Sequence, residues 1–301
     1  MAKIGFIGVG VMGLPMATNL LKNNHQLKAF DTNTNQTALI KKEGATIVNT
    51  SLEATKDVDF VITMLPNGSI VKDVSCGEGG ILHSENKKFI YIDMSTILPG
   101  DIKFINNECK KNHINMLDAP VARLLPEAIA GTLLIMVGGK KEIYEKALPI
   151  LKCMGDTVYH CGANGTGSTM KLINNYMSIV SNIITAETLT LSQMSNISMD
   201  LALEIMRGTA AGKGHMNQTY PNKVLKGDTK AGFTNALATK DLGLAIQHAK
   251  DLNFNLQLGA AAKAIYDESL VEISSKDWTA MYEYILKMIH LTFRNLFLKL
   301  R

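Results

Sequence analysis

The sequence predicts an α/β protein in which a doubly wound, mostly parallel sheet is followed by an all-helical domain. In the first half, short apolar runs alternate with helix-like segments, and after residue 168 no strand-like run is evident. A length of 301 residues favours two domains. We place the boundary in the glycine cluster 162–167, which gives a sheet domain over 1–164 and an all-helical domain over 165–301.

Seven apolar runs in the first half are predicted strands. Several are almost continuously apolar, which is typical of parallel strands buried on both faces. The predicted strands are 3–7, 27–30, 60–64, 89–93, 116–119, 133–137 and 158–160, with helix-like stretches at 17–23, 70–74 and 99–111. In the second half, the predicted helices are 169–194, 201–206, 239–252, 260–270 and 278–298.

The first strand ends in a glycine-rich turn, Gly8-Val-Gly-Val-Met-Gly13, and a helix-like segment follows directly. Gly8 permits a tight turn, Gly10 lets the backbone approach a pyrophosphate, and Gly13 allows close packing of helix on strand. This strand–turn–helix context is that of a Rossmann-type dinucleotide fingerprint. We therefore expect the cofactor to contact Gly8, Gly10, Val11, Met12 and Gly13.

The second predicted strand ends in Asp31, the acid expected to bind the adenosine ribose. A carboxylate accepts hydrogen bonds from free ribose hydroxyls and repels a 2′-phosphate. Residues 32–34 are Thr, Asn and Thr, so no basic side chain stands there to pair a phosphate. The sequence predicts NAD(H) rather than NADP(H).

Composition excludes several classes of function. With 31 basic and 27 acidic residues the net charge is +4, without a basic block, so nucleic acid is not an expected partner, whereas a small anionic substrate is compatible. The four cysteines lack metal-ligand spacing, and they indicate reduced thiols in a cytoplasm and no metal site. We expect no signal peptide, because a strand begins within three residues, and no membrane span.

The helix predicted from residue 169 carries the main candidates for catalysis. Lys171, Asn174, Asn175 and Ser178 are spaced i, i+3, i+4 and i+7, so they share one face of an otherwise apolar helix. Two interpretations are open, an ordinary solvent face or the lining of a cleft. In a cleft, a desolvated lysine has its pKa lowered toward the range useful for proton transfer, and Asn175 can orient the ammonium.

Polar turns follow three of the other predicted strands. Leu65-Pro66 follows one strand, Thr96 lies beyond the next, and Arg123 comes shortly after a third. Open parallel sheets bind ligands at these carboxyl ends, but such turn residues also cap helices, and loop arginines are usually solvated. The sequence by itself leaves both interpretations open.

Several segments together resemble the β-hydroxyacid dehydrogenases, the family that includes 3-hydroxyisobutyrate dehydrogenase and tartronate semialdehyde reductase. The resemblance covers essentially the whole chain. It implies a catalytic Lys171 with Asn175 as its partner, nicotinamide contacts from Leu65 and Thr96, and a Lys240 that reaches over the cofactor. The matching segments are 5–16, 93–96, 118–121, 131–133, 165–167, 171–175 and 240–242.

One segment departs from the common pattern of the family. Members that take carboxylate substrates usually follow Asp-x-Pro-Val with Ser-Gly-Gly, where this chain has Ala122-Arg123-Leu124. Together with 174–178, 208–215 and 220–225, this resembles the branch that interconverts 3-sulfolactaldehyde and 2,3-dihydroxypropane-1-sulfonate. The resemblance implies a small anionic aldehyde as substrate, with residues Arg123, Asn174, Asn175, Ser178 and Thr96 around it.

Other functions stay open at this point. Arg123 could clamp the carboxylate of succinic or tartronate semialdehyde or of 3-hydroxyisobutyrate equally well. A non-catalytic NAD-binding module needs no acid such as Lys171, imine reductases often lack the lysine, and 6-phosphogluconate dehydrogenase has a larger helical domain. The apolar C-terminal helices, for example 281–298, predict a homodimer or homotetramer.

Overall fold

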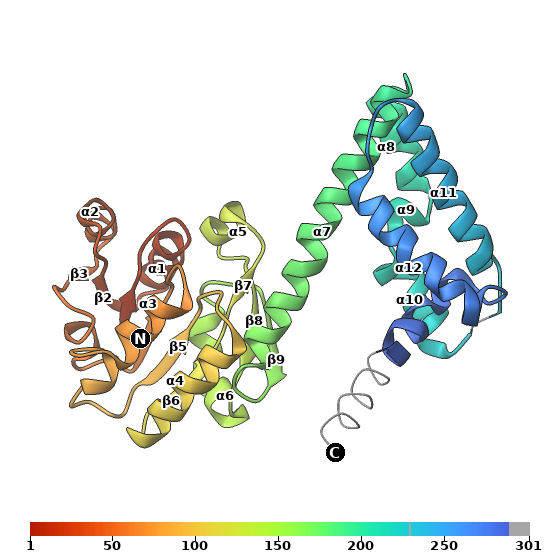
Figure 1. Cartoon of the computed structure of the whole chain (residues 1–301). Helices are drawn as coiled ribbons and strands as arrows, with labels where there is room; N and C mark the ends of the chain where they lie inside the picture. The colour runs from red at the N-terminus through yellow and green to blue at the C-terminus, as the bar shows by residue number, and fades with distance from the viewer. Residues whose placement is uncertain (229, 289–301) are drawn as a thin grey trace, which may run out of the picture. The chain divides into compact units, whose positions relative to one another are not determined.

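The computed structural model describes residues 1–228 and 230–288. The chain divides into two compact units, Met1–Met177 and Ser178–Arg301. The first unit contains a nine-stranded, mostly parallel sheet with helices on both faces, and the described part of the second is helical (Figure 1). The predicted fold class is therefore confirmed. The boundary at 164/165 stays a prediction, and helix α7 begins at Thr166.

The predicted strands are all present; the first agrees at both ends, and the ends of the others differ by at most two residues. Two further strands, β3 and β7, were not predicted, because two residues carry no periodicity that a sequence could show. The strands are β1 Lys3–Ile7, β2 Gln26–Phe30, β3 Thr46–Ile47, β4 Phe60–Thr63, β5 Ile90–Asp93, β6 Asn115–Asp118, β7 Val121–Ala122, β8 Leu134–Gly138 and β9 Thr157–Gly162.

Helices connect the strands of the first unit. The predicted helix over 99–111 agrees with α4 at both ends, which fits a proline at the first helical position and basic residues in the last turn. The helices are α1 Gly13–Lys22, α2 Thr34–Lys42, α3 Gly68–Cys76, α4 Pro99–Lys111, α5 Leu125–Ala130 and α6 Lys141–Leu151. Helix α7, Thr166–Met194, begins in the first unit and ends in the second.

The sheet has the strand order β3-β2-β1-β4-β5-β6-β8-β7, and β9 also pairs with β8. Strands β1 to β6 are parallel, whereas β8 is antiparallel to β6 through the single register pair Asp118–Gly138. The chain therefore brings the carboxyl ends of β1, β2, β4, β5 and β6 to one edge, where doubly wound sheets bind ligands.

Two buried cores cover the faces of this sheet. Neighbouring strand residues alternate between the cores, as Phe6 and Ile7 do on β1 and Tyr91 and Ile92 on β5. Helices α1, α2, α5 and α6 contribute to one core, and α3 and α4 contribute to the other. The sheet edge formed by the carboxyl ends of the strands is thus held from both sides.

The described part of the second unit consists of short and medium-length helices, with α11 and α12 side by side (Figure 1). Its elements are α8 Met199–Gly208, α9 Ala210–Lys213, α10 Tyr220–Asn222, α11 Asn235–Asp251 and α12 Gln257–Ile273. The predicted helix over 278–298 begins as a 3₁₀ turn, Trp278–Ala280, and continues as helix over 281–288. Residues 289–298 of that prediction lie outside the described part of the chain.

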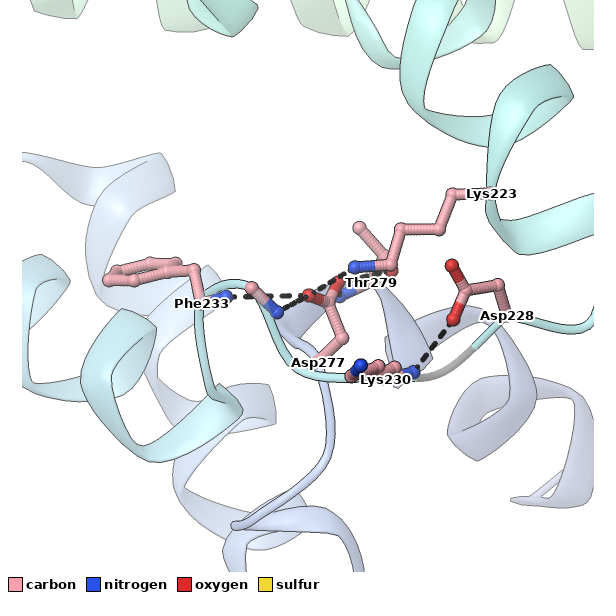
Figure 2. A network of polar contacts seen from close by, with 7 residues as sticks. Lys223, Asp228, Lys230, Phe233, Asp277 and Thr279 are labelled. Carbon is pink, nitrogen blue, oxygen red and sulfur yellow. Dashed lines mark hydrogen bonds and ion pairs between the residues drawn. The ribbon is translucent and has the colours of Figure 1, made fainter.

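Asp277 joins two segments of the second unit. Figure 2 shows Lys223, Phe233 and Thr279 around its carboxylate; the Lys223 ammonium lies 2.7 Å from Oδ2, and the Thr279 hydroxyl donates to Oδ1 over 2.6 Å. Burial alone would raise the pKa of the Asp277 carboxyl, but hydrogen bonds from Lys223, Thr279 and the Gly232 amide hold it well below its usual range. The ionised carboxylate therefore stabilises the connection leading into α11.

Candidate active site

A cavity of about 690 Å³ opens at the carboxyl ends of β1, β2 and β4. Eight of the ten residues predicted to contact the cofactor line it, and Thr96 and Lys240 do not. The eight are Gly8, Gly10, Val11, Met12, Gly13, Asp31, Leu65 and Pro66, brought together from the glycine turn, the end of β2 and the turn after β4.

The glycine turn has a form that only glycine allows. Gly8 has φ +92°, and a side chain there would overlap the backbone of Met64, while a Cβ on Gly13 would overlap the backbone of Gly8. A Cβ on Gly10 would meet no atom of the described residues within 4 Å, so the backbone lies open to the cavity. Met12, the residue before α1, makes no side-chain hydrogen bond to the start of the helix. An open backbone beside an uncapped, positively polarised helix end fits a pyrophosphate.

Asp31 is fixed at the far side of this turn. Its Oδ2 accepts a 2.8 Å hydrogen bond from the Val9 amide, and its Oδ1 accepts one of 2.8 Å from the Asn33 amide. A carboxylate has about four acceptor positions, so both oxygens keep a lone pair for ribose hydroxyls. Among the described residues that line the cavity, none is Lys or Arg.

A buried polar chain connects the turns after β4 and β5. Asp93 Oδ1 accepts 2.7 Å hydrogen bonds from the hydroxyls of Thr63 and Ser95, and Ser95 Oγ in turn accepts from the Leu65 amide over 2.9 Å. Burial raises the pKa of the Asp93 carboxyl to about 6, against hydrogen bonds from Thr63 and Ser95 that lower it. These hydrogen bonds fix Leu65 relative to the segment that leads into the exposed Thr96.

Lys171 and Asn175 lie on α7 and are partly buried, whereas Asn174 and Ser178 are exposed. Burial lowers the pKa of the Lys171 ammonium, which is the direction expected for a proton donor near neutrality. The Asn174 amide lies 3.5 Å from Asn175 Oδ1. The helical spacing expected for the four residues is present, because α7 runs without a break from Thr166 to Met194.

Arg123 has partners of its own in this structure. Its Nη1 donates to the Thr132 carbonyl oxygen and, over 2.7 Å, to Asp156 Oδ1, and its Nη2 donates to Thr157 Oγ1 over 3.2 Å. Among the described residues these contacts use three of its five N–H donors. The guanidinium thus braces the β7–β8 hairpin against β9, and anion binding by Arg123 stays a proposal.

The backbone of Arg123 is unusual as well. Its φ is +76°, a left-handed conformation that favours glycine and costs about 1 kcal/mol for a side chain with a Cβ. Strain of this kind persists where the surrounding contacts hold the residue in place. In Arg123 the bracing contacts with Asp156 and Thr132 supply one such role.

Lys240 lies on α11 in the second unit, is exposed, and has its ammonium 3.0 Å from Asp241 Oδ1. The segments 208–215 and 220–225, which carry part of the family resemblance, also make contacts within this unit. His215 packs edge-on against Trp278 with ring centroids 4.9 Å apart, and Lys223 pairs with Asp277. These contacts give the motif residues a packing role.

The sequence reasoning missed Asp93 and Asp118 as organising residues. Both end buried strands, pair across β5 and β6, and are fully buried. The available signal was an acid at the end of an apolar strand, since an ionisable group there must be hydrogen-bonded. In the described ranges 1–228 and 230–288, no group of three His, Cys, Asp or Glu side chains could hold a metal ion. No helix in these ranges is long and apolar enough to cross a membrane.

Comparison with known proteins agrees with this geometry. Residues 3–162 match the family described as the NAD binding domain of 6-phosphogluconate dehydrogenase. Residues 165–285 match that described as NAD-binding of NADP-dependent 3-hydroxyisobutyrate dehydrogenase. Both halves of the chain therefore match models of NAD-binding dehydrogenases.

Relatives match over nearly the full length. A 3-sulfolactaldehyde reductase of Escherichia coli (strain K12) is 43% identical over 286 residues, covering 95% of this chain and 96% of that protein. A mitochondrial 3-hydroxyisobutyrate dehydrogenase of Drosophila melanogaster is 36% identical over 294 residues, covering 95% and 90%. The solved Mycobacterium tuberculosis 3-hydroxyisobutyrate dehydrogenase with L-serine has a TM-score of 0.67 and 30% identity, covering 95% and 99%. With its dinucleotide cavity, this chain belongs to the β-hydroxyacid dehydrogenase family that includes 3-hydroxyisobutyrate dehydrogenase, and it is an NAD-dependent oxidoreductase acting on CH–OH groups.

Proposed function

We propose that this enzyme uses NADH to reduce a small anionic aldehyde, and that the aldehyde is 3-sulfolactaldehyde, reduced to 2,3-dihydroxypropane-1-sulfonate. The observation that carries the reduction is the partly buried Lys171 on α7, in a unit whose sheet edge forms the dinucleotide cavity. The substrate assignment rests on the similarity to the E. coli 3-sulfolactaldehyde reductase and on the Ala122-Arg123-Leu124 segment.

Lys171 is the proton donor in this proposal. When bound, NADH supplies the hydride to the carbonyl carbon. The carbonyl oxygen then gains negative charge, and the Lys171 ammonium gives it a proton as the alcohol forms. Burial lowers the pKa of Lys171 and so makes this transfer easier, and the neighbouring Asn175 amide orients the ammonium or the oxygen.

The sulfonate is held, we propose, by Arg123 with Asn174 and Ser178. A sulfonate is a tetrahedral anion with three oxygens that stays charged throughout the accessible pH range. Arg123 keeps two N–H donors that the bracing contacts do not use, and two donors of one guanidinium can bind an oxyanion together. Asn174 and Ser178 are exposed polar side chains on the face of α7 that carries Lys171.

The alternative substrate is a carboxylate semialdehyde or a 3-hydroxyacid, such as succinic or tartronate semialdehyde or 3-hydroxyisobutyrate. The observation that favours it is the similarity to 3-hydroxyisobutyrate dehydrogenases. The physical difference is small, because a guanidinium binds a carboxylate and a sulfonate with the same donors.

The test is steady-state oxidation of NADH with each aldehyde in turn. We expect kcat/KM for 3-sulfolactaldehyde to exceed that for succinic and tartronate semialdehyde. In Lys171→Ala, kcat should fall by about 100-fold or more, the usual weight of general acid catalysis. The Kd for NADH should stay within about twofold of wild type, since the cavity residues are unchanged.

Lys111→Ala is the matched control, because Lys111 is an exposed lysine of the same unit that pairs with Glu108. Its kcat should equal that of wild type. A kcat near wild type in Lys171→Ala would assign the proton to another group. A reversed substrate preference would keep the reductase and move its substrate to the carboxylate class.

We also propose that the chain works as a homodimer or homotetramer, in a cytoplasm. Among second-unit residues whose side chains are described, only eight apolar ones are buried, and three of these are alanines before residue 250. Helix α7 exposes large apolar side chains, including Tyr176 at 73% and Ile179 at 63%. Such surfaces favour association with a second copy. A monomer in light scattering at micromolar concentration would contradict this.

A further inference from the structure

Asp118 bonds the first turn of α7 through both of its carboxylate oxygens. Oδ1 accepts a 2.7 Å hydrogen bond from the Gly165 amide, and Oδ2 accepts one of 2.9 Å from the Ser168 amide. The side chain is fully buried at the end of β6. Two N–H groups at the start of a helix, which have no partner within it, are thus satisfied by one fixed acceptor.

Two glycines, Gly138 and Gly167, allow the end of β6 and the first turn of α7 to pack closely. Gly138 is the register partner of Asp118, and a Cβ there would lie 2.5 Å from Asp118 Oδ1. A Cβ on Gly167 would lie 2.9 Å from the Asp118 carbonyl oxygen and 2.9 Å from the Gly138 nitrogen. Neither strand end nor helix can shift toward the other, so the carboxylate sets a definite distance between β6 and α7.

Two further hydrogen bonds fix the loop that leads into α7 and the first turn of the helix. Asn164 donates from Nδ2 to the Met116 carbonyl oxygen over 2.7 Å, and the Thr169 hydroxyl donates to the Gly165 carbonyl oxygen over 2.7 Å. The base of α7 is therefore attached to β6 both before and within its first turn.

Beyond its first turn, the side chains of α7 are partly buried or exposed. In a helix of 29 residues, Gly167 and Ser168 are the buried ones. Lys171 follows Ser168 by three residues, which places it on the same side of the helix about 4.5 Å further along the axis. The position of Lys171 is thus set by the first turn, and the first turn is set by Asp118.

We propose that Asp118 is a positioning residue for the reaction: by bonding the Gly165 and Ser168 amides it fixes the first turn of α7 and so places the Lys171 ammonium. This inference rests on the proposed role of Lys171 as the proton donor. Asp118 acts through the helix and need not touch the substrate or NADH.

The test is a double-mutant cycle on the full-length enzyme. Asp118→Asn keeps the shape of the side chain but turns one acceptor into an NH₂ group that faces a backbone N–H. We expect kcat to fall about tenfold or more, with the Kd for NADH within about twofold of wild type. In a Lys171→Ala background, Asp118→Asn should change kcat by less than about twofold, because the group that it positions is gone.

The single variants separate the two hypotheses. If Lys171→Ala keeps its kcat, the proposed proton donor is wrong. If Lys171→Ala loses kcat but Asp118→Asn does not, or if the two losses multiply in the double variant, the positioning role is wrong. Asn19→Ala is the control, since it removes another buried hydrogen bond of the same unit, from Asn19 Nδ2 to the Ala128 carbonyl oxygen over 2.8 Å. Its kcat should stay within about twofold of wild type.

A measurement on the wild type covers the case in which Asp118→Asn does not accumulate as folded protein. Amide hydrogen exchange should find the Gly165 and Ser168 N–H groups among the slowest of the segment 165–194, since both are buried and bonded to Asp118. Exchange at these two amides as fast as in the exposed middle of α7 would overturn the proposal.

Discussion

The Ser168 amide donates a 2.9 Å hydrogen bond to Asp118, a residue 50 positions earlier in the chain. The bond joins the end of a buried strand to the first turn of the helix that carries Lys171. Since Asp118 is also the register partner of Asp93 across β5 and β6, neighbouring strand ends organise the turns beside the cavity and the helix that carries Lys171. The first turn of α7 is therefore fixed relative to the buried strands of the sheet.

Gly167→Ala should disturb this junction more than an ordinary glycine-to-alanine change. The new Cβ would overlap the Met136 carbonyl oxygen and lie 2.9 Å from that of Asp118, so either α7 or the ends of β6 and β8 must move. Overpacking of this kind costs about 1–3 kcal/mol. Urea unfolding should show that loss, and kcat should fall with it.

Gly100→Ala is the control for that variant. Gly100 lies in the first turn of α4, and in the part of the chain that the structure describes a Cβ there would meet no atom within 4 Å. Alanine is the better helix former by about 0.5–1 kcal/mol, so this variant should be slightly more stable than wild type. Equal unfolding free energies for the two variants would mean that the junction is not closely packed.

Arg123→Gly tests the sulfonate clamp. Glycine suits the φ of +76° at this position, so the backbone is relieved while the cation is lost. If Arg123 binds the substrate anion, kcat/KM for 3-sulfolactaldehyde should fall by about 30-fold, or about 2 kcal/mol, the lower end for losing one side of a charge pair. A short uncharged aldehyde should be reduced as well as before.

Asp156→Asn separates binding from bracing. It weakens the ion pair of 2.7 Å that holds the guanidinium but leaves the cation in place. If Arg123 binds the sulfonate of the substrate, the KM for 3-sulfolactaldehyde should be unchanged or lower in this variant. If Arg123 only braces the hairpin, both variants should affect charged and uncharged aldehydes to the same extent.

Asp31 should set the preference for NAD(H). Its carboxylate is fixed by the Val9 and Asn33 amides beside a cavity whose described lining contains no basic side chain. The wild type should favour NADH over NADPH by at least about tenfold in kcat/KM, and Asp31→Asn should reduce that ratio by about tenfold, because the repulsion of a 2′-phosphate is removed. Asp73→Asn, a second acid of the cavity, should affect both cofactors alike. Equal use of both by the wild type would contradict the prediction.

Asp93 should make stability depend on pH. Since burial raises its pKa to about 6 in the folded protein, the folded form binds the proton more tightly than the unfolded chain does. The unfolding free energy therefore falls as the pH rises through the range between the unfolded and folded pKa values. Between pH 5 and pH 8 this group should remove about 1 kcal/mol, and Asp93→Asn should abolish that part of the slope. Urea titrations at both pH values measure it, and parallel slopes would exclude Asp93 as its source.

The sequence determined what depends on local pattern. The seven longer strands of the first unit and its helices α1, α3 and α4 follow from apolar runs and turn residues, and the predicted bounds of α4 agree with the structure. The glycine turn and Asp31 were predictable because every requirement, from the positive φ of Gly8 to the packing of Gly13, lies within one strand–turn–helix segment. Lys171 and Asn175 were placed on one face by helical spacing alone.

Only the tertiary structure decided which distant groups meet. Arg123 is bonded to Asp156, 33 residues away, and Asp118 to Gly165 and Ser168, across 47 and 50 residues. β3 and β7 exist because longer strands offer them partners. Side-chain hydrogen bonds over such separations depend on the order and register of the strands, and no local pattern of charge or hydrophobicity encodes which buried acid faces which backbone amide.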